Sequence, residues 1–366
     1  MSELLSRRQF FNSTKTALVG FSSFTLASLL RNNSLSAADK VIKNLEAQVP
    51  VLMRKALIPG LSIAVIRNGE VFWSRGFGVT NQVNKKPVNN DTIFAAASLS
   101  KPLVGYAALK MIERGQLELD KPLSDYTAKP YISDPRLKLI TLRRVLSHTT
   151  GFPNWSGDAP LRILRAPGTK FVYSGEGFLY LQHVIEEITQ IPLAQYLQQN
   201  FLDPLGMKSS SFSWQPTYNT TASDGHDRQA KPKPMGKPQK ASAAGSLRTT
   251  ANDYAKFIIA MMAPGKVDSP KLSEASLKNM LSPQIKINQK LDWGLGWGLE
   301  KASNGNFFWH WGDLVTFKSI TVASFDLGAG IVILTNSQNG LKISKNIVQQ
   351  AIGGQHPAFD FWMIEY

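Results

Sequence analysis

The feature that most constrains the fold is the separation of β-rich and helix-rich stretches along the chain. Residues 61–78, LSIAVIRNGEVFWSRGFG, hold two runs rich in β-branched and aromatic residues, joined by Asn68-Gly69, a pair that tolerates the positive φ of a hairpin turn. Strand-like runs return beyond Leu291, in WGLGWGLEK, NFFWHWG, KSITVASFD and GAGIVILTNS. The predicted fold class is therefore α/β of the α+β type, with one antiparallel sheet built from both ends of the chain.

Helical periodicity marks most of the other segments. Apolar residues three to four places apart predict a helix over 39–57, and LKISKNIVQQAI predicts a final helix, so that terminal helices flank the sheet. Between them, TLRRVLSHTTG, GFLYLQHVIEEIT, LAQYLQQNFLDPLG and TTANDYAKFIIAMM predict an inserted, all-helical lobe. The predicted lobes are a sheet lobe at about 39–125 and 290–345, a helical lobe at about 126–289, and a helix end and tail at 346–366.

The first 38 residues have the pattern of a targeting segment. SRRQFF, residues 6–11, is a twin-arginine pattern, and a moderately apolar stretch follows over 16–30. Ser36 and Ala38 suit the small-residue positions before a cleavage site after Ala38. An uncleaved membrane anchor is the alternative, but the apolar stretch is short of the ~20 residues that a helical span needs. We therefore predict a periplasmic or otherwise exported protein, with no membrane span after the leader is removed.

Composition excludes several kinds of site. The chain has no cysteine, which rules out disulfides, thiolate metal sites and cysteine nucleophiles. Its 5 histidines are scattered, with no pair at metal-ligand spacing, so we predict no metal and no cofactor. The formal net charge of +15 suits contact with an anionic cell envelope. A groove-reading helix and a glycine-flanked aromatic strand are both missing, so nucleic acid is not a predicted partner.

Ser98 and Lys101 stand in AAASLSKPL, residues 95–103, where a long apolar helix begins. Three residues apart, the two side chains lie on one face of a helix. Partial burial would lower the pKa of the lysine and let it act as a base toward Ser98 Oγ, and the free amides at the helix start favour a developing oxyanion. The alternative is a capping serine beside a solvated lysine. A Gly-x-Ser-x-Gly elbow and a P-loop are absent from the sequence.

Two further side chains stand where chemistry is plausible. Tyr173 precedes an amphipathic helix in FVYSGEGFLYLQHVIEE, and His310 lies on a predicted strand in FFWHWGD. Gly312 of that strand would let a ligand or another backbone approach closely. Taken singly, Tyr173 is equally well explained as a core or loop aromatic, and His310 as a hydrogen-bonded strand residue. Their order after Ser-x-x-Lys favours a catalytic set.

This ordered set resembles the serine β-lactamase and penicillin-binding-protein superfamily, in particular its class C-like branch of β-lactamases, esterases and D-amino-acid peptidases. The likeness spans roughly 61–337 and includes LSHTTGFP, DPLGM and AAGSLRTTANDYAKF. It implies a β-lactamase/transpeptidase-like fold with the active site between the two lobes. The implied roles are Ser98 as acylated nucleophile, Lys101 as its base, Tyr173 as proton shuttle, His310 in place of the third motif's lysine, and the amides of Ser98 and Asp313 as oxyanion hole.

Two positions that would line the substrate beside Gly312 depart from the family's pattern. Gly175 stands where the second motif ends in asparagine, so a contact to an acylamide side chain is missing. Trp311 replaces a hydroxyl residue of the third motif that helps bind a carboxylate. The indoles of Trp155, Trp309 and Trp311 would line an apolar acyl pocket or, equally, pack in the core.

The sequence therefore predicts an exported serine hydrolase that forms an acyl-enzyme on Ser98 and hydrolyses an ester or small amide. A D-amino-acid peptidase or β-lactamase acting on cell-wall peptides or β-lactams is the alternative among enzymes. A penicillin- or peptidoglycan-binding protein with little turnover is the alternative of another class, favoured by the lost second- and third-motif side chains.

Overall fold

The computed structural model describes residues 37–266 and 268–364. Nearly all of the predicted leader, including its twin arginines, lies outside the described residues. Within those ranges, no helix combines the length and apolar character that crossing a bilayer requires.

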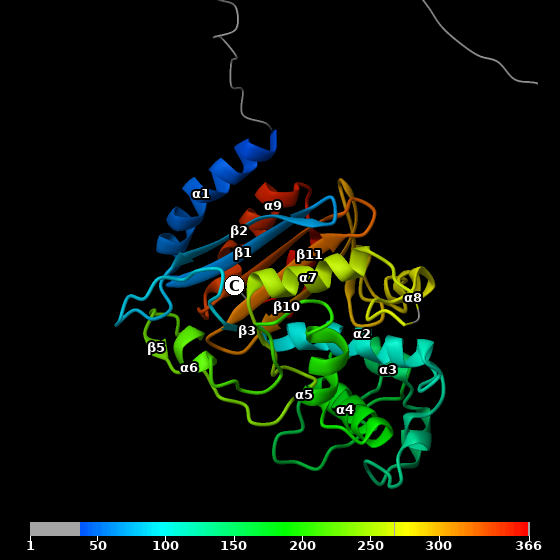
Figure 1. The fold of residues 1–366 in the computed structure, drawn as a ribbon. Coiled ribbons are helices and arrows are strands. Elements are labelled where there is room, and N and C mark those ends of the chain that lie inside the picture. Colours follow the sequence, from blue (N-terminus) through cyan, green and yellow to red (C-terminus); the bar gives the residue numbers. More distant parts are fainter. Residues whose placement is uncertain (1–36, 267, 365–366) are drawn as a thin grey trace, which may run out of the picture.

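An antiparallel sheet lies at the centre of the described fold (Figure 1). Its strand order is β2-β1-β12-β11-β10-β9-β8-β7, so strands from the start of the chain pair with strands from its end. Ile63 of β1 lies opposite Ile333 of β12, which confirms the predicted sheet built from both ends. The strand bounds are β1 Gly60–Arg67, β2 Glu70–Gly78, β7 Ile285–Lys286, β8 Leu291–Trp293, β9 Gly298–Ala302, β10 Gly305–Asp313, β11 Lys318–Ser324 and β12 Ala329–Thr335.

Two turns of the sheet show where local sequence decides and where it misleads. Asn68 and Gly69, with φ of 52° and 72°, join β1 to β2 as predicted. The prediction that 294–298 lies within one strand is wrong for 294–297, whereas Gly298 begins β9. Gly296 has a φ of 88°, and Gly294 and Gly296 lie in the turn between β8 and β9.

Both faces of the inner strands β1, β11 and β12 are buried, and successive side chains of each strand point to opposite sides. Figure 1 shows α1 and α9 on one side of the sheet and α7 on the other. Ile63 and Val65 of β1 belong to the buried cluster that includes α1 and α9, and Ala64 and Ile66 belong to the cluster that includes α7. Burial on both sides explains why the inner strands are continuous apolar runs. The helices are α1 Ala37–Ala56, α2 Ser100–Glu113, α3 Leu142–Leu146, α4 Gly175–Thr189, α5 Leu193–Leu197, α6 Tyr218–Thr221, α7 Ala251–Met262, α8 Glu274–Met280 and α9 Ser344–Ile352.

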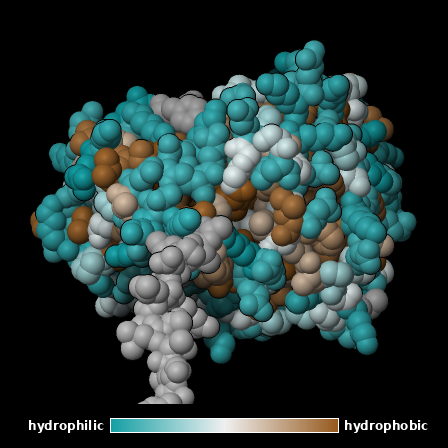
Figure 2. Space-filling view, turned by 90° about the horizontal axis from the view of Figure 1, so that it is seen from above, coloured by the Kyte–Doolittle hydropathy of each residue, from teal (hydrophilic) through white to brown (hydrophobic). Residues whose placement is uncertain are grey.

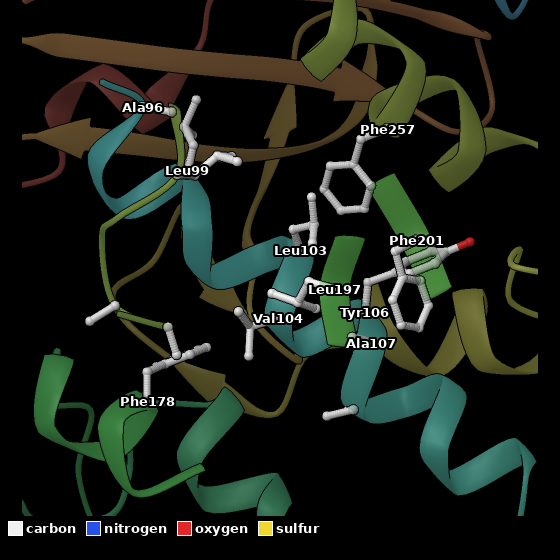
Figure 3. Close-up of a cluster of buried hydrophobic side chains, with 14 of the residues drawn as sticks. Ala96, Leu99, Leu103, Val104, Tyr106, Ala107, Phe178, Leu197, Phe201 and Phe257 are labelled. Carbon is white, nitrogen blue, oxygen red and sulfur yellow. The ribbon is translucent and has the colours of Figure 1, made fainter. Parts of the chain in front are cut away.

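The helix α2 runs through the centre of the helical region. Residues 100–111 are all buried, so α2 is surrounded by protein on every side, as an all-round apolar helix must be. Its neighbours in the cluster of Figure 3 come from α4, α5 and α7 and include Phe178, Leu197 and Phe257. This packing fixes the N-terminal end of α2, where Ser98 and Lys101 lie, against the sheet.

The remaining pairings are short. The ladder of β3 (Phe94–Ala95) with β6 (Arg248–Thr249) brings the segment before Ser98 beside the start of α7, and β4 (Gly225–His226) pairs with β5 (Pro232–Lys233). The lobe boundaries stay a prediction, since α7 belongs by sequence to the helical stretch yet packs on β1 and β12.

The surface on the α1 side is mainly hydrophilic, with apolar residues gathered in smaller groups between polar ones (Figure 2). Exposed apolar side chains on this part of the chain include Val51 and Leu57 near α1. Scattered apolar residues of this kind are normal on a folded domain and point to no partner.

Candidate active site

Ser98 and Lys101 meet at the N-terminal end of α2. Ser98 lies in a 3-10 turn, Ala97–Leu99, that runs directly into the helix. The Lys101 amine donates to Ser98 Oγ at 2.9 Å and to the carbonyl oxygen of Ala244 at 2.7 Å. The turn and helix have no side-chain cap, and Lys101 is 0% exposed. The alternative of a capping serine and a solvated lysine is therefore wrong.

Burial of Lys101 favours its uncharged form. Its Nζ lies 4.9 Å from the ring centroid of Tyr173 and 5.8 Å from that of Phe178, rings that attract an ammonium, but the loss of water around the amine outweighs them. Burial lowers the pKa of Lys101 to about 7. Near neutral pH a large fraction of the amines is therefore neutral, with a lone pair that can accept the Ser98 proton.

The backbone around Ser98 is held against β10 and β11. Ser319 Oγ donates to the carbonyl of Ala96 at 2.9 Å, and Ala97 adopts a φ of 50°, which is strained for a residue with a side chain. A Cβ at Gly312 would lie 2.3 Å from the Ala96 oxygen. The close approach predicted for Gly312 is therefore an approach of the backbone segment that precedes Ser98.

Tyr173 lies beside this pair, immediately before α4. Its ring is buried, with the centroid 4.2 Å from the ring of His148 and 4.9 Å from that of Trp311. Burial raises the pKa of Tyr173, and the nearby Ser98 hydroxyl partly offsets that rise. The Tyr173 hydroxyl has no hydrogen-bond partner among the described residues. It is thus a protonated phenol available to a substrate or to Ser98.

His310 is buried on β10 and close to Tyr173, with 6.2 Å between ring centroids. Its Nδ1 lies 2.7 Å from the carbonyl oxygen of Trp311, and because a carbonyl only accepts, Nδ1 carries the proton. Burial, and then the neighbouring Lys101, lower the pKa of His310 to about 3. The ring is neutral at neutral pH and offers a bare Nε2. It supplies no positive charge in place of the third motif's lysine, and its catalytic role stays a prediction.

Sequence reasoning gave no role to His148, which lies against Tyr173 on its other side. The backbone N–H of Ser174 donates to His148 Nδ1 at 3.0 Å, so the ring proton is on Nε2. Burial, then Lys101 and His310, lower the pKa of His148 well below its ordinary value. His148 is the histidine of LSHTTGFP, one of the segments that carry the family resemblance, and this was the only sequence signal for it.

The structure separates the three tryptophans that were candidates for an acyl pocket. Trp309 is 0% exposed and Trp311 is 3% exposed, and both pack in the core against the ring of Phe361. Trp155 is 55% exposed, and its ring centroid lies 6.0 Å from Lys101 Nζ. Trp155 is thus the indole of the three that an entering substrate can reach.

Asp313 lies at the end of β10. Its carboxylate pairs with Lys318 and accepts from the Val315 N–H at 2.9 Å. Pairing of β10 with β9 ends where Trp309 faces Gly298, so the 310–313 segment has one strand edge that β9 does not cover. A backbone amide on an unpaired strand edge can bind a substrate oxygen, and the oxyanion assignment of Asp313 stays a prediction.

A metal site needs a cluster of ligating side chains. Across 37–266 and 268–364, the structure gathers no three His, Asp or Glu side chains that could hold a metal ion. The expectation of a reaction without metal or cofactor stays a prediction.

Comparison with known proteins places the chain in a family. The family model described as Beta-lactamase matches residues 39–351. The chain belongs to the Beta-lactamase family. It is 27% identical over 238 residues to "Beta-lactamase" of Pseudomonas fluorescens, covering 62% of this chain and 66% of that protein. It is 26% identical over 332 residues to "Protein flp" of Staphylococcus aureus (strain N315), covering 84% of this chain and 64% of that protein. The matches thus span just under two thirds of these relatives' own lengths.

Solved structures share the fold. D-alanine carboxypeptidase AmpC from Burkholderia cenocepacia superposes with a TM-score of 0.75 at 20% identity, covering 86% of this chain and 99% of that one. A class C beta-lactamase gives a TM-score of 0.77 at 18% identity, with 87% and 97% covered. The predicted resemblance to the serine β-lactamase and penicillin-binding-protein superfamily, and the β-lactamase/transpeptidase-like fold, are confirmed.

Proposed function

We propose that this protein is a serine hydrolase that forms an acyl-enzyme on Ser98 and hydrolyses an ester or a small amide. The observation that carries the proposal is the 2.9 Å contact between Ser98 Oγ and the amine of a fully buried lysine whose pKa lies at about 7. Among the described residues, Lys101 forms no ion pair with a carboxylate that would hold it charged.

In the proposed reaction, Ser98 Oγ bonds to the substrate carbonyl carbon while its proton passes to Lys101 Nζ. The resulting oxyanion would accept hydrogen bonds from the backbone amides of Ser98 and Asp313. Collapse breaks the bond to the alcohol or amine, which leaves with a proton from Tyr173 or Lys101. Water then attacks the ester on Ser98, the Oγ–acyl bond breaks, and Ser98 regains a proton as the carboxylic acid departs.

The test compares the purified protein with Ser98→Ala on p-nitrophenyl butanoate, alongside intact-mass detection of an alkyl fluorophosphonate adduct. We expect turnover and a single adduct in the wild type, and neither in the variant. Equal hydrolysis by both proteins would place the chemistry elsewhere. A wild type that neither hydrolyses the ester nor forms the adduct would contradict the hydrolase proposal.

A D-amino-acid peptidase or β-lactamase activity is the second candidate, favoured by the names of the relatives and structural neighbours. Against it stand Gly175 and Trp311, which lack the polar groups that would hold an acylamide and a carboxylate. Hydrolysis of nitrocefin or of a D-Ala-D-Ala peptide at a kcat/KM above that for p-nitrophenyl butanoate would favour this candidate.

The third candidate is a binding protein with little turnover. Its signature would be a penicillin adduct on Ser98, seen by intact mass, that persists for hours while no ester is turned over. The chemically complete Ser98, Lys101 and Tyr173 set argues for turnover instead.

We also propose that residues 1–38 direct export of the folded chain through a twin-arginine route. The support is the sequence alone, SRRQFF followed by an apolar stretch. Replacing Arg7 and Arg8 by lysine should retain a reporter fused to these residues in the cytoplasm, and unchanged export would contradict the proposal.

A further inference from the structure

A contact between Gly175 and Trp155 stands out at the mouth of the site. An added Cβ at Gly175 would lie 2.6–2.9 Å from three carbon atoms of the Trp155 indole, closer than real side chains come. Gly175 is the first residue of α4 and has no left-handed backbone angle. The backbone conformation would therefore accept another residue at position 175. The position of the Trp155 indole is what leaves no room for a side chain there.

The segment that carries Trp155 is fastened on both sides to the start of α4. The Gly175 N–H donates to Asn154 Oδ1 at 3.0 Å, and the Ser156 N–H and hydroxyl donate to Glu176 Oε1 at 2.8 Å and 2.6 Å. The ring between these anchors remains 55% exposed. Because the residues on both sides of Trp155 are anchored and its ring is exposed, the indole can bind an apolar ligand with little loss of conformational freedom.

The position of this surface relates it to the nucleophile. The centroid of the Trp155 ring is 6.0 Å from Lys101 Nζ, and that amine is 2.9 Å from Ser98 Oγ. A group attached to a carbonyl carbon on Ser98 lies within a few ångströms of both atoms. Trp155 is therefore close enough to contact the part of the substrate next to the reacting carbonyl.

We infer that Trp155, seated on Gly175, selects the acyl group of the substrate and favours an unbranched apolar chain without an amide beside the carbonyl. This inference rests on the proposed hydrolase function. Gly175 has no side-chain amide for an acylamide group, and the indole covers the position where a longer side chain would extend. The site is thereby changed from one that hydrogen-bonds an acylamide to one that buries methylene groups.

The experiment measures kcat/KM for p-nitrophenyl acetate and butanoate in the wild type, Trp155→Ala, Gly175→Ala and the double variant. Two further methylenes buried on the indole make butanoate the better substrate of the wild type by roughly tenfold. In Trp155→Ala this preference should largely vanish through loss of butanoate activity, while acetate changes less than about twofold. Gly175→Ala should displace the indole and give the same pattern.

The double variant sharpens the test, because Gly175→Ala has nothing to displace once the indole is absent. We expect it to match Trp155→Ala, a non-additive result that independent effects would not give. The control is Trp73→Ala, which removes a partly buried indole from β2 that packs on Phe77. Its acetate and butanoate rates should fall equally or not at all.

Two outcomes separate the inference from the hydrolase proposal. Equal losses on acetate and butanoate in Trp155→Ala, with fluorophosphonate labelling of Ser98 intact, would overturn the inference alone. A wild type without turnover or labelling would overturn the hydrolase proposal first. Thermal melts of each variant, unchanged to within a few degrees, show that the differences come from the site and not from unfolding.

Discussion

The two ends of α2 each bury a lysine, and they do so in opposite ways. At the C-terminal end, Lys110 is 0% exposed and its ammonium donates to Glu113 at 2.8 Å and to the carbonyls of Lys266 and Lys271. At the N-terminal end, Lys101 is equally buried but donates to a serine hydroxyl and one carbonyl. The comparison teaches that burial alone does not make a lysine a base; the absence of a balancing carboxylate does.

The pKa of Glu113, the ion-pair partner of Lys110, shows the same difference between the two ends of α2. Burial would raise the pKa of Glu113, but hydrogen bonds from Lys110, Ser276 and Ser273 outweigh it and lower the pKa to about 2. That end of α2 is a stable ion pair. The other end is an unbalanced amine beside the proposed nucleophile, which is the kind of local conflict that functional sites keep.

The largest expected effect separates the two lysines by activity. Lys101→Met should lower kcat/KM for p-nitrophenyl butanoate by about 10³-fold, since it removes the proposed base next to Ser98. Lys110→Met should change it less than about threefold, because that residue lies at the far end of the helix. Similar losses in both variants would mean that Lys101 acts only through the packing of α2.

The second effect separates them by stability. Lys110→Met leaves the Glu113 carboxylate without its partner, and urea unfolding should show a loss of about 2 kcal/mol, less than for a deeply buried pair because Glu113 lies partly at the surface. Lys101→Met removes an amine that is unfavourable to bury, so at pH 6 it should leave the protein as stable as the wild type or more stable. A larger loss for Lys101→Met would invert the comparison.

The stability difference between the wild type and Lys101→Met should also change with pH in a defined direction. The pKa of Lys101 falls from an ordinary 10.5 to about 7 on folding, so the folded state binds fewer protons between about pH 7 and 10. Wild-type stability should therefore gain a rising contribution across that window, and Lys101→Met should lack it. The advantage of the variant is expected to be greatest below pH 7. Parallel urea-unfolding curves for both proteins from pH 6 to 9.5 would contradict the assignment.

The smallest expected effect concerns His148, which we place as a positioning residue for Tyr173. His148→Phe keeps an aromatic ring but loses the acceptor of the Ser174 N–H, and kcat should fall about fivefold with KM little changed. His148→Asn restores an acceptor near the Nδ1 position and should recover part of the rate. Recovery that fails while the fold is intact would reduce His148 to a packing residue.

Much of this arrangement could be predicted from the sequence. Runs rich in β-branched and aromatic residues and the Asn68-Gly69 turn indicated the sheet, and Ser-x-x-Lys at a helix start indicated the candidate reacting pair. Both signals are local, because strand period, turn chemistry and helix face are set by residues a few places apart. The structure confirms the sheet and places Lys101 on Ser98.

What could not be predicted depends on contacts between distant segments. The acceptor for Lys101 is the backbone carbonyl of Ala244, which has no side-chain signature. Glycine at 175 was visible as a departure, but its reason is the indole of Trp155, twenty positions away. The glycines of 294–298 alternated like a strand, and only the positive φ of Gly296 shows the turn.

The most direct test of the central claim, that Ser98 is activated by an uncharged Lys101, is the rate of Ser98 phosphonylation by an alkyl fluorophosphonate across pH 5 to 9. We predict a rate that rises about tenfold per pH unit and levels off above about 7, where the Lys101 amine is neutral. His310, with a pKa of about 3, cannot produce a rise in the phosphonylation rate between pH 5 and 7. A rate independent of pH, or the same limb in Lys101→Met, would contradict the account.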